Sequence, residues 1–250
     1  MAVLEHEGAA FACAAEKAGL DASVPTCPEW TVRELVRHIG YVHRWAAAYV
    51  REQRVTVLDD EEEEAAVGPL PDDDAELLPW FREGHSALVA TLRGAPADLE
   101  CWHFLRAPTP LLFWARRQAH ELAVHRSDAE SAAGDTPVTG VGAPFAVDGI
   151  DELLLGFYMR RGGRLRADQP CSLLVEAVDV PDAAWLVRIG PDGAQIARSP
   201  AESNADCVLR GSASDLYLAL WNRRGTDDLD VHGDRSVLDL WRERATVRWT

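Results

Sequence analysis

A glutamate and a histidine four residues apart form the most distinctive chemical pair in the sequence. Glu121 and His125 lie in the stretch 114–130, which lacks proline and glycine and is rich in Ala, Leu, Arg and Glu, so it predicts a helix. Positions i and i+4 share one helix face, so the carboxylate and the imidazole point the same way. A zinc, nickel or iron ion accepts such a pair as two of its ligands. The pair also fits a plain helix-surface contact worth roughly a few tenths of a kcal/mol.

A third ligand would have to come from another helix, and His38 is the candidate. Thr31 and Glu34 form a T-x-x-E capping box, which predicts a helix from about residue 32 to 54. His38 falls on or beside the apolar stripe of this helix. Without a partner, a histidine there is more simply a hydrogen-bonded core residue. His43 lies about 140° further round the axis, so it cannot share a ligand face with His38.

The remaining elements of the first part are also helical. Apolar periodicity and stop signals predict helices over 2–19, 32–54 and 77–92, and Pro110 suits the first turn of a fourth. Bundles of this kind build metal sites from side chains that project inward from facing helices. The acidic stretch 59–76 is interpreted as a solvated linker, which is the usual meaning of a run of like charges.

The pattern changes in the second part of the chain. A segment rich in Gly, Pro, Ser and Thr leads into a helical pattern at 148–161, and the later elements are mixed. Strands are predicted at 171–178, 184–190, 206–210, 229–231 and 246–250, and helices at 214–224 and 234–244. The predicted fold class is therefore α+β in two domains. These are a helical bundle over 1–146 and a small α+β domain with its leading helix over 147–250.

Composition disfavours several classes of partner. The chain has 25 basic and 41 acidic residues, a net charge of −16, which disfavours nucleic acid and anionic membranes. Its five cysteines are scattered and form no CxxC pair, which argues against a disulfide framework and a thiolate zinc site. No signal-peptide pattern and no long apolar run is present, so we expect a cytoplasmic protein. No pattern predicts an oligomeric state.

Four stretches of the chain resemble the mycothiol-dependent maleylpyruvate isomerase family, a branch of the DinB-like metal-binding bundles. They are residues 27–38, 42–45, 120–128, and 211–221 together with 231–234. The first and third are specific when found together at this spacing. The last resembles the smaller C-terminal domain of the family, which is similar to sterol-carrier folds. The acidic stretch has no counterpart in the family.

The resemblance implies that His38, Glu121 and His125 are metal ligands, that the ion is zinc or a similar divalent cation, and that mycothiol is the thiol cosubstrate. Two histidines and one carboxylate leave a coordination position open, as catalytic sites do. A thiol bound there would ionise at neutral pH and attack an electron-poor carbon of a small molecule. The activity would be maleylpyruvate isomerase-like or that of an S-transferase. The alternatives are a metal-binding protein without catalysis and a small-ligand carrier of the same fold.

An anionic substrate would need cationic partners. The candidates are Arg126, Arg160, Arg161, Arg223 and Arg224, although a surface role is favoured for each in so acidic a chain. Arg126 follows a candidate ligand directly and should point to a different face of the helix.

Other side chains near the candidate ligands have supporting roles in this prediction. Asp128 follows His125 by three residues and could orient its imidazole as a hydrogen-bond acceptor, although surface exposure fits it as well. The tryptophans 30, 45, 102 and 114 are interpreted as core or pocket wall.

Overall fold

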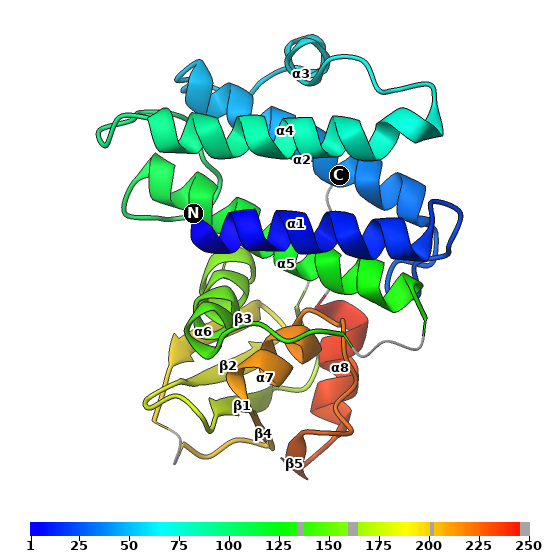
Figure 1. Ribbon diagram of the computed structural model, residues 1–250. Coiled ribbons are helices and arrows are strands. Elements are labelled where there is room, and N and C mark those ends of the chain that lie inside the picture. The colour runs from blue at the N-terminus through cyan, green and yellow to red at the C-terminus, as the bar shows by residue number, and fades with distance from the viewer. Residues whose placement is uncertain (135–137, 160–164, 201–202, 246–250) are drawn as a thin grey trace. The chain divides into compact units, whose positions relative to one another are not determined.

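The computed structural model describes residues 1–134, 138–159, 165–200 and 203–245, and the chain forms two compact units, residues 1–139 and 140–250 (Figure 1). The first unit is helical and the second combines a sheet with helices. The predicted α+β class is therefore confirmed, while the domain limits 1–146 and 147–250 remain a prediction. Among the described helices, none combines the length and apolar character that crossing a membrane requires.

Four long helices and one short helix make up the described part of the first unit. They are α1 (Ala2–Ala18), α2 (Val32–Arg51), α3 (Asp60–Val67), α4 (Asp74–Gly94) and α5 (Pro110–Ala132). The helix α1 packs against α5, and α2 packs against both α4 and α5. Apolar side chains from these helices form the core, which includes Phe11, Leu35, Ile39, Phe81 and Leu122. This packing places α2 and α5, the helices with the candidate ligands, next to each other.

Side chains at their N-terminal ends fix where these two helices begin. The backbone N–H of Thr31 donates to Oε2 of Glu34 at 2.9 Å, as the capping-box prediction requires. Thr109 caps α5 through its Oγ1, which accepts from the N–H of Leu112 at 3.2 Å, and Pro110 occupies the first turn as predicted.

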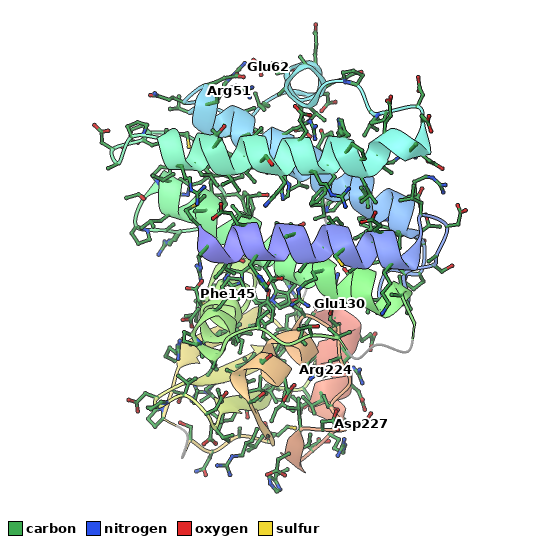
Figure 2. The ribbon with its side chains drawn as sticks, in the orientation of Figure 1. Arg51, Glu62, Glu130, Phe145, Arg224 and Asp227 are labelled. Carbon is green, nitrogen blue, oxygen red and sulfur yellow. The ribbon has the colours of Figure 1, made fainter. Side chains whose placement is uncertain are left out.

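The acidic stretch is not a linker throughout, because residues 60–67 form α3. Oδ1 of Asp59 accepts from the N–H of Glu62 at 2.9 Å, and Oε2 of Glu62 accepts from the N–H of Asp59 at 3.2 Å, so the two residues form a capping box. The positive end of the helix dipole also favours carboxylates in a first turn. Glu62 lies near Arg51 at the end of α2 (Figure 2). Arg54, three residues further on, donates to Glu62 at 2.5 Å. The prediction of four helices was therefore one short.

The second unit begins with α6 (Ala143–Asp151), which continues as a π-helical turn, Glu152–Phe157. This helix starts earlier than the predicted 148, with Pro144 in its first turn. The strands are β1 (Cys171–Ala177), β2 (Ala184–Gly190), β3 (Gly193–Arg198), β4 (Cys207–Gly211) and β5 (Asp230–Gly233), and the remaining helices are α7 (Ala213–Leu220) and α8 (Ser236–Arg244). The predicted strand at 246–250 and the predicted helix end at 160–163 lie outside the described residues.

These strands form one mixed sheet in the order β3-β2-β1-β4-β5. The pair β1–β4 is parallel and the other three pairs are antiparallel. The prediction missed β3, whose sequence GAQIAR has a single large apolar residue because this edge strand buries only Ile196. The helices α7 and α8 both pack against β1, so the centre of the sheet is buried.

Candidate metal centre

The structure brings the three predicted ligands together. His38 comes from α2, and Glu121 and His125 lie one turn apart on α5. Oε1 of Glu121 is 3.2 Å from Nε2 of His38 and 3.3 Å from Nε2 of His125. The three potential ligand atoms all lie within 4.8 Å of one another. Glu121 and His125 are buried, whereas 17% of the His38 side chain is exposed, so solvent reaches the group from the His38 side.

The donor set and its spacing fit a zinc-like ion. In tetrahedral coordination at about 2.0–2.1 Å, neighbouring ligand atoms are held roughly 3.3 Å apart. The two distances to the carboxylate oxygen agree with this value. The same distances also fit long hydrogen bonds between each imidazole and the carboxylate. The carboxylate oxygen thus lies at a ligand-like distance from both imidazole nitrogens.

The two oxygens of Glu121 have different surroundings. Oε1 faces both imidazoles, whereas Oε2 accepts a hydrogen bond from Nη2 of Arg117 at 3.0 Å. Burial acts to raise the pKa of this carboxyl group, but hydrogen bonds from His125 and His38 and the charge of Arg117 outweigh it and hold the pKa well below its usual range. Glu121 is therefore an anion even though it is buried.

His125 is held from its other side by Asp128. Nδ1 of His125 lies 2.7 Å from Oδ2 of Asp128, which is completely buried. Burial acts to lower the pKa of His125, but hydrogen bonds to Asp128 and Glu121 outweigh it and raise the pKa. Because Asp128 accepts the proton on Nδ1, Nε2 is the atom directed at Glu121 and available to a metal. The contact considered from the sequence is therefore present.

Comparison with known proteins identifies the family of the chain. The sequence model of the mycothiol maleylpyruvate isomerase N-terminal domain matches residues 2–130, and that of the C-terminal domain of the same family matches residues 144–240. The chain belongs to this family. The candidate ligands of this family member all lie within the part matched by the N-terminal domain.

Solved structures agree with this family assignment at the level of the fold. Two crystal structures, of the mycothiol-dependent maleylpyruvate isomerase and of a point mutant of it, superpose with TM-scores of 0.59 and 0.60 at 14% and 12% sequence identity. Each comparison covers 92% of this chain and 90% of the other chain. At such identities the likeness supports the fold alone. A search of curated proteins gave no match.

The tryptophans of this family member divide into pocket wall and core. The ring of Trp30 lies 5.0 Å from the ring of His38 and 6.1 Å from that of His125, so Trp30 forms a wall of the candidate site. The indoles of Trp45 and Trp102 instead pack on Trp114, at 5.1 and 6.3 Å. These three form part of the aromatic core of the bundle, and both interpretations of the tryptophans fit the structure.

The surface role favoured for the arginines is wrong for Arg126. This residue faces away from the candidate ligands as expected, but it is buried between α5 and α1. Its Nε lies 2.5 Å from Oε2 of Glu7, and its Nη1 lies 2.9 Å from Oε2 of Glu130. Arg224 is paired with Asp215, and Arg223 donates to the carbonyl of Trp221 at 2.8 Å. Arg160 and Arg161 lie outside the described residues.

The sequence analysis missed Arg117, Thr26 and Glu7. Arg117 precedes Glu121 by four residues, so the spacing that linked Glu121 to His125 also predicts this contact when it is applied backwards along the helix. Thr26 and Glu7 come from other parts of the chain, and their partners Asp128 and Arg126 could not be identified from spacing.

Proposed function

We propose that this member of the family is a divalent-metal-dependent enzyme that activates a low-molecular-weight thiol, mycothiol, for attack on an electrophilic small molecule. The observation that carries the proposal is the approach of His38, Glu121 and His125 to within 4.8 Å of one another. Two imidazoles and one carboxylate provide three ligands and leave a position open, which is typical of catalytic zinc sites.

Each protein group has a role in this proposal. A divalent ion such as zinc would supply Lewis acidity that lowers the pKa of a thiol at the open position, so that the thiolate forms at neutral pH. Asp128 holds Nδ1 of His125, so that Nε2 would be the atom that binds the ion. The exposed side of His38 gives the thiol and the substrate access, and Trp30 bounds the site beside both imidazoles.

Two reactions are compatible with this site. In an isomerase, the thiolate sulfur forms a bond to one carbon of a cis carbon–carbon double bond. The π electron pair of that double bond then moves toward the adjoining carbonyl group and gives an enolate. Rotation about the resulting single bond and cleavage of the carbon–sulfur bond then give the trans product and return the thiol. In an S-transferase the enolate takes up the proton that the thiol lost, the carbon–sulfur bond persists and the thiol is consumed as the adduct. The structural relatives are crystal structures of a mycothiol-dependent maleylpyruvate isomerase, which supports the first reaction.

Metal analysis of the purified chain tests the site. We expect one equivalent of divalent metal in the wild type and none in His38→Ala, Glu121→Ala and His125→Ala. The matched control is His85→Ala, which removes a half-buried histidine of α4 outside the ligand group. Metal that persists in all three ligand variants would contradict the proposed site.

Turnover assays test the activity and separate it from the non-catalytic alternatives. With maleylpyruvate as substrate we expect product only when both metal and mycothiol are present, and unchanged mycothiol after the reaction if the protein is an isomerase. Loss of free mycothiol in proportion to product would assign an S-transferase. Bound metal without any turnover would favour a metal-binding protein. Binding of apolar ligands that survives His38→Ala would favour a small-ligand carrier.

A further inference from the structure

Arg117 is the buried cation next to the candidate ligands on α5. Only 1% of its surface and 3% of the surface of Glu121 are exposed, and Nη2 of Arg117 lies 3.0 Å from Oε2 of Glu121. The other oxygen, Oε1, lies 3.2 and 3.3 Å from Nε2 of His38 and of His125. One oxygen of the Glu121 carboxylate therefore contacts a guanidinium group, and the other contacts two imidazoles.

We propose that Arg117 is a positioning residue that restricts Glu121 to one-oxygen coordination of the metal. The inference rests on the metal site proposed above. A carboxylate can bind a cation through one oxygen or both, and the choice depends on what else its oxygens contact. Here the guanidinium group occupies Oε2, and burial keeps water from replacing it.

This restriction has a consequence for catalysis. Two imidazole nitrogens and one carboxylate oxygen would occupy three positions of a tetrahedral ion and would leave one for the thiol. Binding through both oxygens of Glu121 would add a ligand atom beside that position, raise the coordination number to five and weaken the binding of the thiol. The positive charge of Arg117 also offsets the negative charge of Glu121, which leaves more of the charge of the metal to act on the thiol.

A purely structural role for Arg117 makes a different prediction. Pairs of opposite charge at i and i+4 are common on helices and are usually exposed, where they contribute little to stability. A buried pair that only supported the helix would change the free energy of unfolding when broken. It would leave the coordination number of the metal and its affinity for thiols unchanged.

Cobalt substitution tests the proposal. Co²⁺-loaded wild type should show the intense visible absorption of four-coordinate cobalt, and β-mercaptoethanol should add a sulfur-to-cobalt charge-transfer band. In Arg117→Met we expect the weaker absorption of five-coordinate cobalt, as Oε2 joins the metal, and a thiol affinity at least about tenfold lower. Arg117→Leu tests the same point if the methionine variant does not fold, since leucine carries no donor for Oε2.

Arg116→Met is the matched control, because it removes the neighbouring cation of the same helix, which is only partly buried. It should retain the wild-type spectrum and thiol affinity. A wild-type spectrum in Arg117→Met or Arg117→Leu, with unchanged thiol affinity, would overturn the role of Arg117 alone. Failure of the wild type to bind Co²⁺ would instead overturn the proposed metal site.

Discussion

Nδ1 of His125 and Oδ2 of Asp128 lie 2.7 Å apart, within one turn of α5. The other oxygen of Asp128 accepts from Oγ1 of Thr26 at 2.5 Å, and Sγ of Cys27 lies 3.8 Å from Oδ2. Thr26 and Cys27 belong to the loop that leads into α2. Asp128 therefore connects the orientation of a candidate ligand on α5 to the loop that precedes the helix of His38.

Asp128→Asn should weaken metal binding. The neutral amide is a poorer acceptor for the proton on Nδ1, so His125 loses part of the force that directs Nε2 at the metal. We expect an affinity for Zn²⁺ roughly 10–100-fold lower, measured by competition with a chromophoric chelator. Glu130→Gln is the control, since it removes a carboxylate from the same helix that contacts Arg126 rather than His125. An equal loss of affinity in both variants would show that the loss of a negative charge from α5, and not the loss of the His125 contact, weakens metal binding.

Glu7 and Arg126 make a buried ion pair. Breaking it should lower the free energy of unfolding much more than breaking an exposed pair. Their polar atoms lie 2.5 Å apart, and both side chains are buried between α1 and α5. Glu7→Leu removes a partner of a buried guanidinium group, so we expect a loss of about 3 kcal/mol in the free energy of unfolding. The double variant Glu7→Leu with Arg126→Met should recover most of this loss, because the guanidinium group that lost Glu7 is also removed and Glu130 still accepts from the N–H of Thr139.

Denaturant unfolding measures these changes, and α1 supplies its own control. Glu5 pairs with Arg93 at 2.7 Å, but both side chains are at least 40% exposed. Glu5→Leu should therefore cost less than about 1 kcal/mol. A double variant no more stable than Glu7→Leu alone would contradict the explanation by unpaired charge.

The ligand group could be predicted because its spacing is local. One turn of helix relates Glu121 to His125, and a capping box identifies the helix that carries His38. The contacts of Asp128 with Thr26 and of Arg126 with Glu7 span 102 and 119 residues. No local pattern identifies such pairs, since they depend on how α1, α2 and α5 pack. For this reason Arg126 was expected at the surface, although it is buried.

The short helix α3 in the acidic stretch was missed for a different reason. Its net charge indicated solvation, which holds for most of its side chains, but charge alone does not exclude a helix. Asp59 with Glu62 is the same type of capping signal that identified α2, and its position within a charge run concealed it. Similarly, β3 was missed because an edge strand needs few apolar residues.

Asp59→Ala should unfold α3 preferentially. The variant removes the acceptor for the N–H of Glu62, which costs about 1 kcal/mol, and a helix of eight residues has little other support. We expect faster amide hydrogen exchange over residues 60–67 and little change in α2 or α4. Glu61→Ala is the control, since it removes an acid from the same first turn without removing the cap. Equal effects of the two variants would assign the stability of α3 to charge at its first turn instead.

His43 makes the stability of the first unit dependent on pH. It is fully buried on α2, its ring lies 5.2 Å from that of His85, and neither of its nitrogens has a hydrogen-bond partner among the described residues. Burial, assisted by His85, Arg44 and His38 and opposed by Glu121, holds the pKa of His43 well below its ordinary value of 6.5. Burial also lowers the pKa of His85.

His43→Leu should therefore stabilise the protein, most of all in acid. Below pH 6.5 the unfolded chain binds a proton at residue 43 that the folded chain excludes, so the wild type loses stability as the pH falls. The variant lacks this proton uptake, and it also removes two buried nitrogens without partners, which should raise the free energy of unfolding by about 1 kcal/mol at pH 7.5. Denaturant titrations of metal-free protein between pH 7.5 and 5 should show the advantage of the variant growing as the pH falls. His232→Leu removes an exposed histidine of β5 and should leave the pH profile unchanged. An advantage of His43→Leu that stays constant with pH would show that His43 also titrates normally in the folded chain.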